Sequence, residues 1–391
     1  MSICRGRTKV WVLAGMLLCV HLGAQMAAKK AVGSGGNAVK PKVETQTLDL
    51  TRVETIDGMP AATVMSFPEL CSSDGDIFSL VYATSGSDKV ATIPDVYGVS
   101  PQRTVKRLSI PLPQNFKFTT VESFFPGKFS LVYLIQGIDP QGVASDGDSA
   151  KHQFFLAETD RDGDSPQVTK LELPFDPGKL AVFDNGDLLS FGANTTNLYP
   201  VLALLHADGS LNRILNFDDR SYRDAILSGG AYVSHPNDSN TAAQERLILG
   251  SLAKAQLIPW GSEILLVQPG SNLPVYRISS AGAVTPVKLS LPNGFSLQTI
   301  EGSGAHDTWL AVVQDISSFM QVNSGHVAMN PPEQMFEVDP NTGKTLRALD
   351  VRGPHIGEVS CGANHKASAI YYGKPSGKDG PSQLMYASAP R

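Results

Sequence analysis

Short segments in which apolar and polar residues alternate recur along most of the chain, and this alternation is typical of half-buried β-strands. Three of these segments stop at a proline, and they cover Val105–Pro111, Val168–Pro174 and Pro286–Pro292. Proline cannot donate a hydrogen bond to a sheet ladder, so it occurs at strand ends and on edge strands. We therefore predict that each of the three is the outermost strand of its own sheet.

The residues that follow two of these strands resemble each other over a longer stretch. Leu112–Glu122 and Leu291–Glu301 both begin with Leu-Pro, have Phe in the fifth place and end with Thr, a β-branched residue and Glu. The second copy starts about three units of ~60 residues after the first, and a fixed period of this kind indicates repeated supersecondary units.

Turn residues separate the predicted strands at regular intervals. Each unit has a first hairpin, with turns at 74–75, 126–127, 185–186, 260–261, 302–304 and 363–364, and all units but the last have a second, with turns at 100–101, 160–163, 208–209, 281–282 and 341–343. Many of these turns contain Asp-Gly or Asn-Gly, which adopt the φ > 0 conformations that match strand twist. The last unit lacks its final strand because the chain ends there.

A segment at the start of the folded region, Glu44–Thr51, alternates like the missing strand and belongs to no unit. A six-bladed β-propeller in which this N-terminal strand completes the last blade accounts for both observations, because radial closure leaves no exposed sheet edge. We predict an all-β fold with one propeller domain over residues 44–391, and seven blades as the alternative.

Two units carry a resemblance to a known group of proteins. Leu180–Leu189 and Met335–Lys344 resemble the blades of bacterial extracytoplasmic six-bladed β-propellers of the TolB-like and NHL-like kind. The resemblance is one of blade pattern over residues 44–391. It implies an exported propeller and assigns no ligand.

The N-terminus has the pattern of a secretory signal. Arg5, Arg7 and Lys9 precede the apolar run Val10–Val20, which is shorter than the ~20 residues that a membrane-spanning helix needs. We predict a signal peptide over residues 1–26, a flexible leader over 27–43, no membrane span after cleavage, and a periplasmic or secreted location.

Of the four cysteines, two remain after the signal is removed, Cys71 and Cys361. Each lies eleven residues before a tyrosine, Tyr82 and Tyr372, so they occupy matching places in the first and last units, which ring closure makes neighbours. In an oxidising compartment such a pair is a disulfide candidate. The alternative is two separate buried thiols.

The composition narrows the class of partner. The chain contains 36 glycines and 26 prolines, which suits a turn-rich fold, and its formal charge is −5 at pH 7. No basic excess is available to neutralise a phosphate backbone, so we expect no nucleic-acid partner. We expect a monomer.

Acidic residues stand shortly before several of the first-hairpin turns, a position that opens onto the central channel of a propeller. They are Glu69, Glu122, Glu301 and Glu358, and His306 follows the third of them. A ring of carboxylates there could hold an axial Ca²⁺, which prefers hard oxygen ligands. The alternative is a solvated channel mouth that holds no metal.

The sequence contains no Gly-x-Ser-x-Gly elbow, HExxH motif or P-loop. Its longest irregular stretch, Asp218–Gln244, is interpreted as a lid, a partner-binding loop or a plain insertion. We predict a non-catalytic binding or scaffold module for a protein, peptide or glycan. The alternative is a metal-dependent lactonase- or lyase-like enzyme with its site at the central channel.

Overall fold

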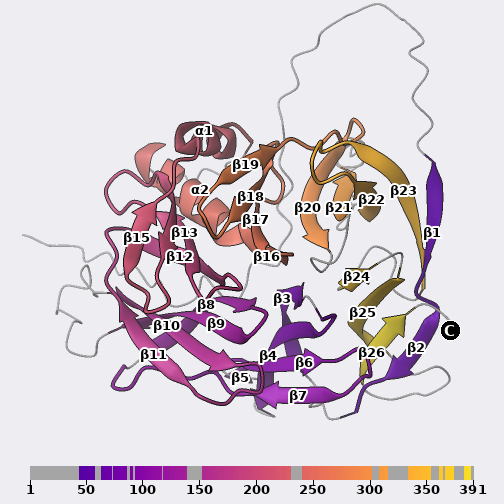
Figure 1. Cartoon of the computed structure of the whole chain (residues 1–391), viewed down its shortest axis with the longest axis horizontal. Coiled ribbons are helices and arrows are strands. Elements are labelled where there is room, and N and C mark those ends of the chain that lie inside the picture. Colours follow the sequence, from indigo (N-terminus) through magenta and orange to yellow (C-terminus); the bar gives the residue numbers. More distant parts are fainter. Residues whose placement is uncertain are drawn as a thin grey trace, which may run out of the picture.

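Six β-sheets surround a common axis in the computed structural model of the chain (Figure 1). The structure describes residues 44–57, 63–72, 74–85, 89–90, 93–116, 118–138, 152–229, 240–301, 308–315, 333–353, 361–363, 366–373 and 383–388. The sheets follow one another along the chain, and the first strands β3, β8, β12 and β16 lie nearest the centre of the view. This is the predicted six-bladed β-propeller, and the seven-bladed alternative is wrong.

Within each blade, the strands are arranged side by side from the central axis to the outside. Blade 1 contains β3 (Thr63–Cys71), β4 (Ile77–Ser85), β6 (Asp95–Val99) and β7 (Val105–Leu108), with β5 (Lys89–Val90) paired to β4. Blade 2 contains β8 (Phe118–Pro126), β9 (Ser130–Ile138), β10 (His152–Asp160) and β11 (Gln167–Leu171), and blade 3 contains β12 (Asp176–Val182), β13 (Leu188–Ala193), β14 (Pro200–Leu205) and β15 (Leu211–Ile214). Blade 4 contains β16 (Gln256–Trp260), β17 (Glu263–Val267), β18 (Val275–Ser279) and β19 (Val284–Val287). Blade 5 contains β20 (Phe295–Glu301), β21 (Trp309–Asp315), β22 (Glu333–Val338) and β23 (Thr345–Arg352), and blade 6 contains β24 (Cys361–Ala363), β25 (Lys366–Gly373) and β26 (Gln383–Ser388).

The last blade is completed by an N-terminal strand, as predicted, but the strand is not Glu44–Thr51. It is β2 (Arg52–Thr55), which pairs antiparallel with β26. The earlier segment forms β1 (Thr45–Asp49), a fifth strand of blade 5 that runs parallel to β23. The reason is that Leu48 and Leu50 are buried in the apolar cluster between blades 5 and 6, which draws this segment to the preceding blade.

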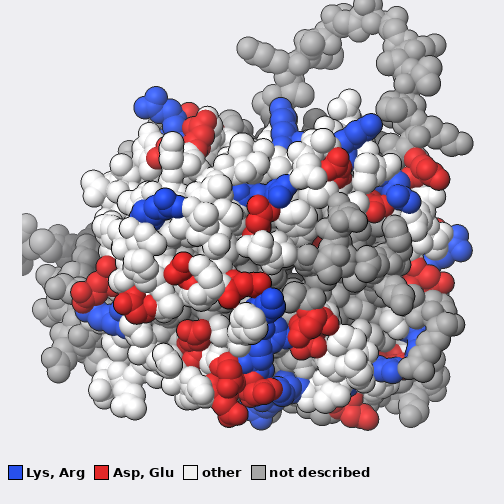
Figure 2. Space-filling model, in the orientation of Figure 1, with Lys and Arg blue, Asp and Glu red and all other residues white. Residues whose placement is uncertain are grey.

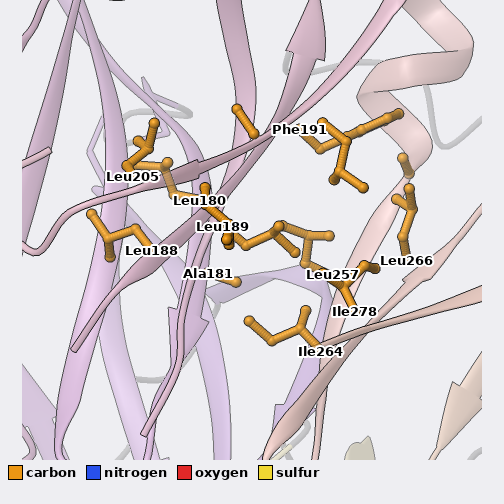
Figure 3. Packing of buried hydrophobic residues seen from close by; sticks show 14 of the residues in the cluster. Leu180, Ala181, Leu188, Leu189, Phe191, Leu205, Leu257, Ile264, Leu266 and Ile278 are labelled. Carbon is orange, nitrogen blue, oxygen red and sulfur yellow. The ribbon is translucent and has the colours of Figure 1, made fainter. Parts of the chain in front are cut away.

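Apolar clusters fill the space between neighbouring blades. Separate clusters join blades 1 and 2, blades 4 and 5, blades 5 and 6, and blades 6 and 1, and one large cluster joins blades 2, 3 and 4. Figure 3 shows part of the large cluster, where Leu189 of blade 3 lies close to Leu257 of blade 4. Burying one such leucine side chain stabilises the fold by roughly 1.5–3 kcal/mol, and each interface buries several apolar side chains.

In blades 2 to 5, glycines of the second-hairpin turns lie against the outer strand of the preceding blade. Gly163 and Gly209 have φ of +84° and +82°, and a Cβ at these glycines would lie 2.9 Å from Leu108 and 2.6 Å from Leu171 respectively. Gly343 approaches the preceding blade through its backbone, because Ser290 N donates to its carbonyl oxygen at 2.8 Å. The turn chemistry predicted from the sequence thus also sets the spacing between blades.

Charged side chains add contacts between the turns of blades 1 and 2. Figure 2 shows acidic and basic side chains side by side over the part of the ring where β4, β6 and β7 lie. Arg161 donates to Asp76 at 2.9 Å, and Lys106 pairs with Asp162. The Lys106–Asp162 pair is exposed, and exposed ion pairs contribute about 0–1 kcal/mol each. The Arg161–Asp76 pair is partly buried and fixes the turn of blade 2 against blade 1.

A disulfide joins the first and last blades. Cys71 on β3 and Cys361 on β24 are bonded, with 5.3 Å between their Cα atoms and a sequence separation of 290. Both are buried among Ile56, Ile77 and Ile370. The predicted pairing is confirmed.

No helix in the described part of the chain is long and apolar enough to cross a membrane. The predicted signal peptide (1–26) and leader (27–43) lie outside the described residues. Export therefore stays a prediction.

Removing the disulfide should destabilise the ring, because the bond closes a long loop across the seam. We expect the double variant Cys71→Ser/Cys361→Ser to lose about 2–5 kcal/mol of unfolding free energy in urea titrations. Dithiothreitol should lower the stability of the wild type and leave that of the double variant unchanged. Two titratable thiols in the unreduced mature protein would contradict this account.

Alanine at a second-hairpin glycine should cost more than alanine at a first-hairpin glycine. Gly343 and Gly186 both have positive φ (+68° and +88°), but a Cβ at Gly343 collides with the Lys288 backbone, whereas the nearest atom at Gly186 is 4.0 Å away. We expect Gly186→Ala to cost about 1–2 kcal/mol through φ alone, and Gly343→Ala to cost a further ~1–3 kcal/mol through overpacking. Equal losses in chemical denaturation would show that the contact between blades does not constrain this turn.

Candidate functional site

A groove lies beside blade 3, between the loop 194–199 and the segment 214–220. The loop follows β13, and the segment runs from the end of β15 into α1 (Asp219–Gly229). The groove has a volume of about 540 Å³. Its lining residues are Asn194, Asn197, Tyr199, Pro200, Val201, Leu202, Ile214, Leu215, Asn216, Phe217, Asp219 and Arg220.

Two helices connect blades 3 and 4, where the sequence indicated an irregular stretch. They are α1 and α2 (Asn240–Lys254), and residues 230–239 between them lie outside the described residues. Asp218 caps α1 by accepting a hydrogen bond from Ser221 N at 2.9 Å, and this interaction lowers the pKa of the Asp218 carboxyl. Tyr222 and Ile226, four residues apart, are buried. The cap and this spacing are the signals that could have revealed the helix.

An aromatic cluster fixes α1 to the propeller. Tyr222 is 0% exposed, and its ring centroid lies 5.6 Å from that of Phe191, 5.8 Å from that of Phe217 and 5.9 Å from that of Tyr276. Its hydroxyl donates to Gln268 Oε1 at 2.8 Å. Burial raises the pKa of Tyr222, so the phenol stays protonated and keeps this bond. Phe217, which belongs to this cluster, also forms part of the groove wall.

Gln268 ties the second helix to the same point. Its Nε2 donates to the carbonyl of Ser251 on α2 at 3.0 Å, while its Oε1 accepts from Tyr222 on α1. The Gln268 side chain is 5% exposed. A buried amide that bonds both helices holds them in one position relative to blade 4.

The opposite wall of the groove is held by its own asparagines. Asn194 Oδ1 accepts from Thr196 N at 2.9 Å and from Asn197 N at 3.2 Å, and Asn197 Oδ1 accepts from Tyr199 N at 3.0 Å. These are Asx turns, which fix a loop without sheet pairing. Leu198 completes the loop in the left-handed region, with φ of 57°.

An arginine of α1 bridges the two walls. The guanidinium of Arg223 lies 5.0 Å from the centroid of the Tyr199 ring. Its Nε is buried and has no hydrogen-bond partner in the described part of the structure. This cation–π contact holds the Tyr199 ring against α1.

The channel residues singled out from the sequence are only partly described. Glu122 is the extra residue of a β-bulge in β8, is exposed, and accepts a hydrogen bond from Thr120 Oγ1 at 2.6 Å. Glu69 lies in β3, but its side chain is outside the described part, as are Glu358 and His306 entirely. The carboxylate ring therefore stays a prediction.

Glu301 does not occupy the place of Glu122. The corresponding bulge in β20 falls at Gln298, and Glu301 is the last residue of that strand. The sequence match between 112–122 and 291–301 therefore does not carry over to the bulge. Among the described residues, no three His, Cys, Asp or Glu side chains gather where they could hold a metal ion.

A lysine that the sequence reasoning missed stands near Glu122. Lys179 follows a bulge in β12, and the next residue, Leu180, donates its N–H to Ser123 Oγ at 3.0 Å, which brings the two inner strands together. Burial lowers the pKa of Lys179, and the charge of Glu122 opposes this. Burial and the same carboxylate raise the pKa of Tyr82. Bulges re-aim side chains, and Gly178 before Lys179 is the sequence signal for this one.

Comparisons with known proteins identify no family for the chain. No family model and no curated protein matches it. Among solved structures, it is similar to a GH74 xyloglucanase from Xanthomonas campestris, with 12% identity over 76% of this chain and 39% of that one and a TM-score of 0.41. It is also similar to the β-propeller domain of the Trilobed protease from Pyrococcus furiosus (8% identity, 83% and 84% covered, TM-score 0.37) and to the GH43 protein BlXynB from Bacillus licheniformis (8%, 78% and 58%, 0.36). The chain spans about two fifths of the xyloglucanase's length, and its function has to be inferred from its own residues.

Lys179 should make stability depend on pH. The folded chain loses the Lys179 proton at a lower pH than the unfolded chain, so it binds fewer protons and its stability rises with pH below the ordinary lysine value of 10.5. We expect the wild type to gain unfolding free energy relative to Lys179→Met between pH 7 and pH 9.5 in urea titrations. Lys128→Met, which removes an exposed lysine paired with Asp184 at 3.3 Å, is the control and should show no such gain. A pH-independent difference for Lys179→Met would contradict the assignment.

Proposed function

We propose that this chain is an exported β-propeller that binds its ligand without transforming it, and that the ligand docks in the groove between loop 194–199 and α1. The observation that carries the proposal is that both groove walls are fixed before any ligand arrives. One wall is a loop closed by asparagine side chains, and the other is a helix anchored through Tyr222 and Gln268. Pre-organised sites bind more tightly because less conformational freedom is lost on binding.

The chemistry of the lining supports recognition rather than reaction. Aromatic rings (Tyr199, Phe217), an exposed Ile214 and several amides face the groove, together with one acid and one base. Apolar walls with a few polar groups are typical of ligand sites. This lining is compatible with a protein, peptide or glycan.

The proposed location outside the cytoplasm is supported by residues far from the groove. The Cys71–Cys361 disulfide persists in an oxidising environment, and the predicted signal peptide leads to one. Both support a periplasmic or secreted protein, and the blade pattern supports a relation to the TolB-like and NHL-like propellers.

A second candidate is the metal-dependent lactonase- or lyase-like enzyme, favoured by the bulges that bring Glu122 and Lys179 close to each other at the inner strands. It requires a stoichiometric divalent ion in the purified protein, lost on Glu122→Gln. A protein that binds in the groove keeps its affinity after treatment with a chelator.

The assignment of the groove as the binding site is tested by a substitution that fills the groove. Ile214 is 57% exposed in the groove, and Leu346 is 41% exposed on blade 5, so arginine at either place leaves the core intact. We expect Ile214→Arg to weaken binding at least tenfold, and Leu346→Arg to leave it unchanged, in calorimetric titrations with hexasaccharides and with unstructured decapeptides. Binding that Ile214→Arg does not affect, or that requires Glu122, would overturn the proposal.

A further inference from the structure

We infer that the occupant of the groove is an uncharged oligosaccharide chain, an inference that rests on the proposed function and names its ligand class. The groove combines side-chain donors and acceptors with aromatic faces, while most N–H groups of its loop wall are already hydrogen-bonded. This combination fits a sugar chain better than a peptide.

The loop wall of the groove, residues 194–199, offers no ladder for a peptide strand. Peptides that add to a sheet are held mainly by backbone hydrogen bonds. Here Leu198 N donates to Asn194 O at 2.9 Å, and on the opposite wall Leu215 N donates to Leu202 O at 2.8 Å. The same holds for the N–H groups of Asn194, Thr196, Asn197, Tyr199 and Asp219.

The asparagine side chains of the groove, in contrast, have hydrogen-bonding groups that no described residue uses. The oxygens of Asn194 and Asn197 are used in the Asx turns, whereas their NH₂ groups donate to no described residue. Asn216 is exposed, and none of its side-chain atoms bonds to a described residue. An amide presents both donors and an acceptor. A sugar hydroxyl also both donates and accepts, so it can bond to the amide NH₂ group or to the amide oxygen.

Aromatic rings provide faces for the C–H surfaces of pyranose rings. Tyr199 is held on one side by Arg223 at 5.0 Å. Phe217 is held by Tyr222 and Tyr276, with ring centroids 5.8 and 6.0 Å away. Rigid aromatic side chains supply contact area at low cost in conformational entropy. A chain of pyranose rings can contact the Tyr199 and Phe217 rings at the same time.

The charges of the lining cancel. Asp219 and Arg220 are its only ionised side chains among the described lining residues, so the groove favours neither an acidic nor a basic ligand. Its volume of about 540 Å³ lies within the ~300–1,000 Å³ of small-ligand sites. An uncharged oligosaccharide fits both the balanced charge and the volume of the groove.

The test uses the mature protein with neutral hexamers of β-1,4-linked glucose, xylose and N-acetylglucosamine, a hexamer of galacturonic acid, and a pool of unstructured decapeptides. Calorimetry measures the binding of each to the wild type, Tyr199→Ala, Tyr199→Phe, Asn216→Ala and Ile214→Arg. Circular dichroism and urea titration confirm that each variant is folded.

We expect at least one neutral hexamer to bind, with affinity reduced at least tenfold in Tyr199→Ala and Ile214→Arg, about threefold or more in Asn216→Ala, and less than threefold in Tyr199→Phe. Decapeptide or galacturonate binding that Ile214→Arg abolishes, without binding of neutral hexamers, would overturn the sugar assignment and leave the groove as the binding site. If none of the probes binds in a way that depends on Ile214, both the inference and the proposed function are wrong.

Discussion

The close approach of neighbouring blades is the constraint on which the rest of the structure depends. A propeller closes only if each sheet lies against the next at a fixed distance, and in blades 2 to 5 glycines at φ > 0 in the second-hairpin turns permit that distance. The space that remains is filled by apolar clusters between every pair of neighbours. At the seam, where the two ends of the ring meet, the same role passes to β2 and to the Cys71–Cys361 bond.

The groove is an extension of this packing. The two helices between blades 3 and 4 do not lie loosely on the surface, because Tyr222 continues the apolar cluster of those blades and Gln268 bonds to both helices. Phe217 belongs to that cluster and also faces the groove. Since packed cores resist deformation, the stability of the ring also holds the binding surface in place. The inner strands of blades 2 and 3 differ from the groove, because a bulge in β8 exposes Glu122 and Lys179 of β12 lies close to it.

The features that were predicted correctly from the sequence are those that depend on residues close together in the chain or on repeated spacing. Asx-Gly turns and alternating strands revealed six blades, and the matched spacing of Cys71 and Cys361 revealed the disulfide. Sequence reasoning assigned the wrong segment, Glu44–Thr51, as the closing strand, because local alternation does not reveal that Leu48 and Leu50 are buried between blades 5 and 6.

The groove was beyond prediction for a related reason. Its walls are brought together by tertiary contacts, and the signals for α1 were a single cap and one pair of buried residues. The sequence match between Glu122 and Glu301 did not reveal that the bulges of β8 and β20 fall at different places, Glu122 and Gln298, because a bulge is a local shift of strand pairing. Local patterns therefore predicted the elements and the ring, whereas the placement of side chains around the groove depended on packing between segments far apart.

The central claim is that the ligand lies in the groove of blade 3. A crystal structure of the protein grown with the hexasaccharide that it binds most tightly tests this directly. The account predicts electron density for sugar rings against Tyr199 and Phe217, with hydroxyls within hydrogen-bond distance of the Asn194, Asn197 and Asn216 side chains. Density beside Glu122 and Lys179, with the groove empty, would contradict it.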